Sequence, residues 1–122
     1  MPSLKKIYHL STCSTCARII AELGLKKKGF EFQDIKTEKI TPAQLKEMKK
    51  KAGSYEALFS RVALKYRAMK LNERTLSDEE MKDLILQEYT FLKRPVILAG
   101  DEIFIGNAKK TVAAAAQTLK GK

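Results

Sequence analysis

The first 35 residues follow the pattern of a strand, a helix and a second strand, and this order constrains the fold more than any other feature. Leu4–Leu10 is a short apolar run that leads into turn residues, and a helix is predicted from about Thr15 to Leu23 with Gly24 as its stop. Phe30–Ile35 alternates between apolar and polar residues, which predicts a second strand. Because a helix joins them, the two strands are expected to be parallel, with a right-handed crossover.

Residues 41–90 are predicted to be an all-helical insert of about three helices. Two segments, Thr41–Gln44 and Ser77–Glu80, have the residue types of a capping box, and the first also has proline at the first helical position. Between them, Ser54 is expected to open a further helix, because four apolar or aromatic residues follow it at helical spacing: Leu58, Phe59, Val62 and Tyr66.

The end of the chain is predicted to form a β-hairpin and a closing helix. Pro95–Leu98 and Glu102–Ile105 flank a glycine turn, and Ala108–Leu119 is rich in alanine. The fold class is therefore α/β, a four-stranded mixed sheet with a helical insert in the order βαβ, helices, ββα. We expect residues 1–122 to be a single domain, with a core of 1–40 and 91–122 and an insert of 41–90.

The composition predicts a soluble globular protein of the cytoplasm. Of the 122 residues, 44% are hydrophobic and 31% are charged. No run approaches the roughly 18 apolar residues of a membrane helix, and the first residues do not begin a signal peptide. We therefore expect no membrane partner, and in the cytoplasm a Cys-x-x-Cys motif is more often catalytic or redox-sensing than structural.

The net charge of +10 points to anionic partners such as oxyanions, phosphates or acidic proteins. The excess is spread along the chain, with 8 basic and 4 acidic residues in 1–40, 10 and 8 in 41–90, and 6 and 2 in 91–122. Two lysine triplets, Lys26–Lys28 and Lys49–Lys51, end helical patterns, where they complement the helix dipole. Neither triplet has aromatic residues interleaved with its cations, so direct nucleic-acid binding is not expected.

The only two cysteines lie in Cys13-Ser14-Thr15-Cys16, where the first strand gives way to the helix. The unpaired N–H groups and the positive dipole end of a helix favour the thiolate. With Cys13 at the N-cap, Cys16 is the third helical residue, roughly 5–6 Å away between α-carbons and within disulfide range. Cys13 would then be the exposed nucleophile and Cys16 the resolving thiol. Alternatively, the two are small buried hydrophobic residues that lie close together.

A metal site is not expected from these cysteines. Zinc needs two further ligands, and the chain has one histidine, His9, and no second cysteine pair. His9 ends the first strand close to the thiols, where it either tunes them or is an ordinary strand-end residue.

Arg94-Pro95 is the second pair with chemical meaning, because X-Pro is the only common place for a cis peptide bond. If the strand after it lies beside the first strand, Arg94 is close to the cysteine turn. There it would raise the thiolate fraction and hold an oxyanion through bidentate hydrogen bonds. The alternative is a surface cation that precedes a turn proline.

The chain resembles the arsenate reductase family of thioredoxin-like proteins, which includes glutaredoxin-dependent arsenate reductases and Spx-type transcription regulators. The resemblance covers nearly the whole chain. It rests on the Cys-x-x-Cys turn, on Tyr66-Arg67 of the insert and on the run Leu-Lys-Arg-Pro-Val-Ile over 92–97. It implies a thioredoxin-like fold.

The resemblance also implies roles for individual residues. Cys13 matches the nucleophilic cysteine, Arg94 the arginine before the cis-proline, and Pro95 that proline. Cys16 matches the second cysteine of Spx-type members, where arsenate reductases usually have serine. Substrate binding is expected from Pro95 and the turn residues Ser14 and Thr15, with Arg61 as a candidate for the insert arginine.

Three positions depart from the pattern of the arsenate enzymes. Ile105-Gly106-Asn107 stands where a third arginine is expected, Arg61 is displaced from the usual insert position, and Ala17 stands where arginine commonly follows the second cysteine. A tetrahedral dianion is usually held by several cationic or N–H donors, so these departures weigh against efficient arsenate binding.

Two functions follow from the resemblance. In the first, the chain is a thiol-dependent oxidoreductase: the Cys13 thiolate attacks arsenic or a protein or glutathione disulfide, Arg94 and Arg61 steady the anion, and Cys16, glutathione or a glutaredoxin resolves the adduct. No bound cofactor is expected. In the second, the chain is an Spx-like regulator in which Cys13 and Cys16 form a redox switch and a surface patch binds RNA polymerase.

Overall fold

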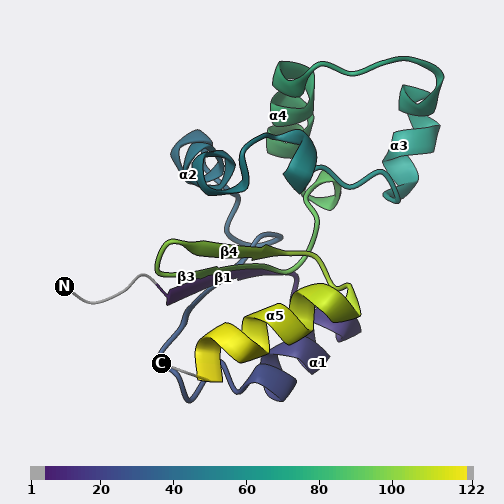
Figure 1. Cartoon of the computed structure of the whole chain (residues 1–122). Coiled ribbons are helices and arrows are strands. Elements are labelled where there is room, and N and C mark those ends of the chain that lie inside the picture. The colour runs from purple at the N-terminus through teal and green to yellow at the C-terminus, as the bar shows by residue number, and fades with distance from the viewer. Residues whose placement is uncertain (1–4, 121–122) are drawn as a thin grey trace. The chain divides into compact units, whose positions relative to one another are not determined.

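The structure, a computed structural model, describes residues 5–120. It contains a four-stranded mixed sheet in the order β2-β1-β3-β4 (Figure 1). β1 pairs in parallel with β2, while β3 pairs antiparallel with both β1 and β4. This confirms the predicted α/β class, the βαβ unit and the hairpin. The strands are β1 (Lys5–His9), β2 (Glu31–Asp34), β3 (Val96–Ala99) and β4 (Glu102–Ile105).

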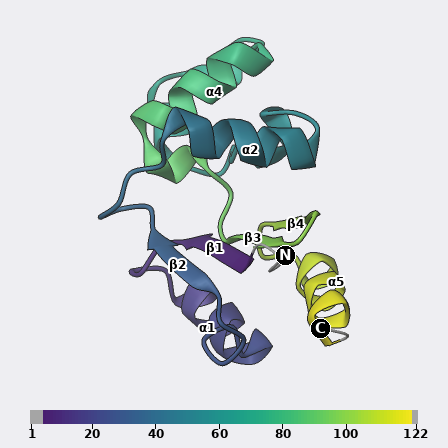
Figure 2. The same ribbon diagram turned by 90° about the vertical axis from the view of Figure 1, so that its left-hand side faces the viewer.

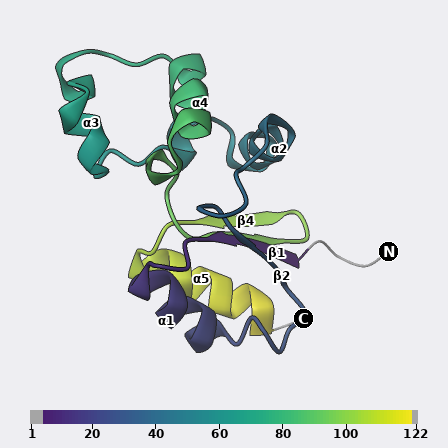
Figure 3. The same ribbon diagram turned by 180° about the vertical axis from the view of Figure 1, so that it is seen from behind.

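The chain divides into two compact units. Residues up to 38 and from 94 onwards form the first, here called the sheet unit, and 39–93 form the second, here called the helical unit. The sheet unit holds all four strands together with α1 (Ser14–Leu23) and α5 (Lys109–Lys120). Both helices lie on the same face of the sheet (Figures 1 and 3).

The core of the sheet unit is built where these two helices cover the sheet. Ile7 of β1 is paired with Ile97 of β3, which in turn is paired with Phe104 of β4, and all three side chains are buried. Such alternate strand residues point to one face of the sheet. The helices add apolar side chains to the same cluster, namely Ile19, Ile20, Leu23, Ala115 and Leu119.

α1 begins and ends where the sequence predicts. Cys13 is its N-cap in an extended conformation, and Gly24 follows the helix with a positive φ of 63°. A residue without Cβ adopts this left-handed conformation without steric cost, and the Gly24 N–H donates to the carbonyl of Ala21. The predicted stop at Gly24 is therefore confirmed, and it turns the chain towards β2.

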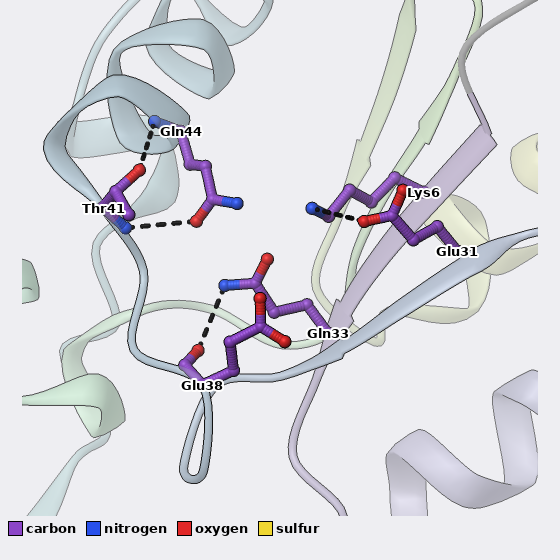
Figure 4. A network of polar contacts seen from close by, with 6 residues as sticks. All are labelled: Lys6, Glu31, Gln33, Glu38, Thr41 and Gln44. Carbon is purple, nitrogen blue, oxygen red and sulfur yellow. Dashed lines mark hydrogen bonds and ion pairs between the residues drawn. The ribbon is translucent and has the colours of Figure 1, made fainter.

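Two polar contacts hold β2 in the sheet unit (Figure 4). Lys6 of β1 is paired with Glu31 across the parallel strands, and its ammonium group lies 3.1 Å from the Glu31 carboxylate. Gln33 is buried, and its side-chain amide donates a 3.1 Å hydrogen bond to the carbonyl of Glu38. This bond satisfies a buried polar group that would otherwise lose its contact with water.

The helical unit contains α2 (Pro42–Ala52), α3 (Leu64–Ala68) and α4 (Asp78–Gln87), with three short 3₁₀ turns, η1 (Glu56–Leu58), η2 (Leu71–Glu73) and η3 (Tyr89–Phe91). Both predicted capping boxes are confirmed. Thr41 and Gln44 exchange two 3.1 Å hydrogen bonds at the start of α2, which Figure 4 shows. Ser77 and Glu80 exchange bonds of 3.1 and 3.2 Å at the start of α4.

The helix expected to begin at Ser54 and continue through Tyr66 is wrong. Only the 3₁₀ turn η1 forms there, and α3 starts at Leu64. Between them the backbone pairs with a distant segment: Ser60 donates to Phe91, Lys93 donates to Leu58, and Phe59 forms a bridge with Leu92. These bonds use backbone N–H and C=O groups that a continuous helix would need for its own hydrogen bonds, so the helix is interrupted. Val62, expected on a packed face, is 91% exposed.

Candidate functional site

The cysteine turn joins the end of β1 to the start of α1. The Cys13 N–H donates a 2.9 Å hydrogen bond to the carbonyl of Leu10, which closes the turn. Cys13 then caps the helix, so Ser14, Thr15 and Cys16 are the first three helical residues. Cys13 is half-buried, whereas Cys16 is fully buried. The turn thus presents one thiol towards solvent and places the other beneath it.

The pKa of Cys13 lies below its usual value. Burial acts to raise it, but hydrogen bonds from the backbone N–H and the thiol of Cys16 and from the backbone of Thr15 act in the opposite direction. The positive charge of Arg94 adds to them, and together they outweigh burial. These donors stabilise the thiolate, so at neutral pH a larger fraction of Cys13 is ionised than in a free cysteine.

The pKa of Cys16 moves the other way. It is raised to about 11, and burial is the largest cause. The hydrogen bond with Cys13 and the negative charge of its thiolate also raise it, while a hydrogen bond with the backbone of Leu10 and the charge of Arg94 act to lower it. Cys16 therefore stays protonated at neutral pH and donates its S–H to the Cys13 sulfur. The alternative of two buried hydrophobic residues describes only Cys16, because Cys13 is half-buried.

Arg94 and Pro95 lie where β3 begins, beside the cysteine turn. Tyr8 of β1 is paired with Val96 of β3 in an antiparallel ladder, so the residues before Val96 lie next to those after Tyr8. The Arg94-Pro95 peptide bond is cis, and the Pro95 carbonyl accepts a 2.9 Å hydrogen bond from Gly106. Arg94 is half-buried, and its charge lowers the pKa of both cysteines. Its proximity to the thiols is as expected from the sequence.

Asp34, at the end of β2, contacts the turn that precedes Cys13, although the sequence analysis did not predict it as a site residue. It is paired with His9 at the ends of the parallel strands β2 and β1. The Ser11 side chain hydrogen-bonds the Asp34 carboxylate and lowers its pKa, and backbone N–H groups of Ser11 and Lys36 also donate to it, at 3.4 and 3.1 Å. Asp34 therefore holds the turn that precedes Cys13.

His9 is half-buried and lies edge-on to Phe32, with 5.6 Å between ring centroids. Burial lowers the pKa of His9, and the negative charge of Asp34 opposes this only in part. The imidazole is accordingly neutral at pH 7. The groups that contribute most to the pKa shifts of the two cysteines are burial, the backbone and thiol groups of the turn, and Arg94. A tuning role for His9 stays a prediction.

The other expected binding residues are placed as follows. Ser14 is exposed and Thr15 half-buried in the first turn of α1, and Pro95 is buried. Arg61 belongs to the helical unit, where it lies 3.0 Å from the Glu56 carboxylate and over the Phe59 ring. Its part in binding substrate stays a prediction, as do the substrate contacts of Ser14, Thr15 and Pro95.

Among residues 5–120, no three His, Cys, Asp or Glu side chains are grouped so that they could hold a metal ion. Over the same range, no helix combines the length and the apolar character needed to cross a membrane.

The fold is that of a known family. The model of the ArsC family matches residues 8–115, and the protein belongs to that family. The chain is also similar to the uncharacterized protein YusI of Bacillus subtilis (strain 168). The two are 27% identical over 104 residues, which cover 81% of this chain and 86% of YusI.

Solved structures support the same fold. An arsenate reductase from Vibrio cholerae is 17% identical with a TM-score of 0.77, covering 93% of this chain and 98% of that one. A protein from Staphylococcus aureus COL is 28% identical with a TM-score of 0.70, covering 91% and 97%. The chain thus has the thioredoxin-like fold of its family. Membership of the family supports a thiol-dependent, reductase-like role.

Proposed function

We propose that the chain is a thiol-dependent oxidoreductase in which Cys13 is the nucleophile and Cys16 the resolving thiol. One observation carries the proposal: two hydrogen-bonded thiols lie in one turn at the start of α1, Cys13 half-buried and Cys16 fully buried, so that their pKa values shift in opposite directions. Such a pair supplies one group that attacks at neutral pH and one that stays protonated until it is needed.

The reaction with a disulfide proceeds in two exchanges. The Cys13 thiolate attacks one sulfur of the substrate, forms a mixed disulfide and releases the other sulfur as a thiolate. Cys16 then loses its proton and attacks the Cys13 sulfur, which forms the Cys13–Cys16 disulfide and releases the second substrate thiolate. Two electrons pass from the protein to the substrate, and glutathione or a glutaredoxin returns them.

The first exchange prepares the second. The negative charge of the Cys13 thiolate is one of the contributions that raise the pKa of Cys16. This charge disappears when the mixed disulfide forms, so Cys16 ionises more easily at the moment when its thiolate is required. Arg94, whose charge lowers the pKa of both thiols, favours each thiolate in turn.

Arsenate is the second substrate class to test. The Cys13 thiolate would displace a hydroxide from arsenic and form a sulfur–arsenic bond. The hydroxide is protonated and leaves as water. A second thiol would then attack the Cys13 sulfur and release arsenite, so that arsenic gains two electrons. Arg94 is the cation of the sheet unit beside the thiol, and the missing third arginine predicts weak arsenate binding.

A redox-sensing regulator of the Spx type is the alternative, favoured by the presence of a second cysteine in the turn and by Ile105-Gly106-Asn107 in place of an arginine. In this case the Cys13–Cys16 disulfide would itself be the signal, read by RNA polymerase bound to the surface of the chain.

Turnover assays separate these functions. Reduction of glutathione disulfides and of arsenate is measured with glutathione and glutaredoxin, for the wild type and for Cys13→Ser and Cys16→Ser. We expect disulfide turnover that Cys13→Ser abolishes and Cys16→Ser strongly reduces. Full activity of Cys16→Ser would show that it is not the resolving thiol. If no donor supports turnover and the protein binds purified RNA polymerase in a redox-dependent way, the proposed enzymatic function is wrong.

A further inference from the structure

A hollow of about 470 Å³ opens on the sheet unit, beside the cysteine turn. It is lined by the end of β1, by α1 and by β2, which forms an edge of the sheet next to α1 (Figure 2). Small-molecule sites in proteins typically measure about 300–1,000 Å³. The hollow therefore has the size of a ligand site. It involves neither Arg94 nor the two sulfurs.

The floor of the hollow is apolar. Ile20 of α1 and Leu10 after β1 are buried, and Phe32 of β2 packs against the core while remaining partly exposed. The hollow stays open because α1 has only alanine on the face above this floor. Ala17 and Ala21 are four residues apart, so they lie one above the other on the helix, and both are exposed.

The rim of the hollow is positively charged. Lys26 and Lys27 line it, and none of its described lining residues is acidic. The only other titratable group there is His9, which is uncharged at neutral pH because burial lowers its pKa. Asp34, the carboxylate nearest to His9 in the strand register, is held by the turn residue Ser11 and does not line the hollow.

The two rim lysines are not needed to end the helix. The sequence suggests that Lys26–Lys28 complement the dipole of α1. Of the three, Lys28 donates a 2.9 Å hydrogen bond to the carbonyl of Leu23, and none lies within the last turn of the helix. The ammonium groups of Lys26 and Lys27 make no hydrogen bond or ion pair with other described residues, and both side chains are exposed. Their charge is therefore available to a ligand.

We propose that this hollow binds an organic carboxylate with an apolar body, such as an aromatic acid. The apolar body lies on Ile20 and Phe32 beneath the two alanines, and the carboxylate lies at Lys26 and Lys27. Release of water from the apolar floor drives binding, and the lysines select the anion. This site is separate from the thiol chemistry proposed above and does not depend on it.

The test uses ¹⁵N-labelled full-length protein titrated with 2-naphthoate and with its uncharged counterpart, 2-naphthalenemethanol. We expect the naphthoate to shift amide resonances of α1 and of residues 26–32 and to bind more tightly than the alcohol. Ala21→Phe fills the hollow from an exposed helix position and should weaken binding about tenfold or more. Ala17→Leu serves as a second filling variant if Ala21→Phe disturbs the circular dichroism spectrum.

Two controls are matched to these variants. Lys26→Gln with Lys27→Gln should weaken naphthoate binding about twofold to fivefold and leave the alcohol unchanged. Two variants outside the hollow should leave the binding of both the naphthoate and the alcohol unchanged. One is Lys50→Gln with Lys51→Gln, from the other lysine triplet, and the other is Leu64→Ser, at an apolar side chain that is 91% exposed. The proposal fails if no resonance in α1 shifts, if the shifts map to Leu64, or if both filling variants bind like the wild type. Equal affinity for the acid and the alcohol would show that the hollow does not select an anionic ligand.

Discussion

At the scale of single residues, the two cysteines show how position alone separates two identical thiols. Cys13 caps α1 and receives hydrogen bonds from the helix N-terminus, so its pKa falls. Cys16 is three residues further on and fully buried, so its pKa rises to about 11. As the pH is raised, the thiol of Cys13 should therefore become reactive at a lower pH than a free cysteine, and the thiol of Cys16 at a much higher pH.

The thiol of Cys16 is one of the donors that lower the pKa of Cys13, which gives a first prediction. Cys16→Ala removes the donor and should move the alkylation profile of Cys13 to higher pH. Cys16→Ser keeps a donor and should leave the profile near that of the wild type. The measurement is the rate of iodoacetamide alkylation of Cys13 between pH 5 and 10, followed by mass spectrometry. Identical profiles for the two variants would show that Cys16 does not stabilise the thiolate.

Arg94 gives a second prediction, because its charge acts on the Cys13 thiolate. Arg94→Gln should raise the pKa of Cys13 and slow its alkylation at pH 7 severalfold. Arg94→Lys retains the charge and should recover most of the rate, although it loses bidentate hydrogen bonding to an oxyanion. The same alkylation assay measures both variants. An unchanged rate in Arg94→Gln would show that Arg94 does not stabilise the Cys13 thiolate.

How far the sequence predicts the site depends on whether a residue acts locally. Cys13 at the N-cap and Cys16 at the third helical position follow from the helix pattern alone. The candidate role of Arg94 needs one further step, the expected position of its strand beside the first strand. Asp34 could not be found in this way. It joins the turn only because the parallel register places it beside His9, and no nearby residue in the sequence signals that pairing.

At the scale of elements, the start of α4 links two parts of the helical unit. Ser77 accepts the Glu80 N–H within the capping box, while the Asp78 carboxylate accepts the N–H groups of Tyr55 and Glu56, at 3.2 and 2.9 Å. The capping box is visible in the sequence, since it uses residues three positions apart. The bonds from Asp78 span more than twenty residues and are not.

A third prediction compares these bonds. Ser77→Ala should lower the free energy of unfolding by about 1 kcal/mol, the usual cost of losing an N-cap. Asp78→Ala leaves two backbone N–H groups without their charged acceptor and should cost more, about 1.5–3 kcal/mol. Urea denaturation followed by circular dichroism measures both. Thr75→Ala, at an exposed neighbouring position, is the control and should change little. A larger loss in Ser77→Ala than in Asp78→Ala would contradict this order.

The interrupted helix after Ser54 shows why element prediction failed at one place. Apolar residues at helical spacing are present, but Leu58, Phe59 and Ser60 pair their backbone with residues near 91–93. Such pairing depends on a segment about thirty residues away, whereas helical periodicity is a local signal. The sequence therefore predicts the helices that have their own caps and misjudges the segment that is shaped by distant contacts.

At the scale of the whole molecule, the chain consists of two compact units, and both cysteines, Arg94 and Asp34 belong to the sheet unit. The groups that contribute most to the pKa shift of Cys13, namely Thr15, Cys16 and Arg94, are likewise all within it. The helical unit contains Arg61, whose expected role is to bind substrate. We therefore expect the sheet unit to set the ionisation of Cys13.

A fourth prediction follows from this division. Leu45 is fully buried in the helical unit, and Leu45→Ala should lower the free energy of unfolding by about 2–5 kcal/mol through loss of packing. The pH profile of Cys13 alkylation, measured well below the denaturation midpoint, should not change. A shifted profile in the folded variant would show that the helical unit also sets the pKa of the thiol.

The division of roles between Cys13 and Cys16 is tested most directly by trapping the mixed disulfide. Reduced wild type, Cys16→Ser and Cys13→Ser are mixed with oxidised glutathione, quenched with acid and analysed by intact-mass and peptide mass spectrometry. We expect Cys16→Ser to accumulate one glutathione on Cys13, the wild type to pass to the Cys13–Cys16 disulfide without retaining glutathione, and Cys13→Ser to stay unmodified. A stable glutathione adduct on the wild type, or rapid modification of Cys16 in Cys13→Ser, would contradict the division of roles between the two cysteines.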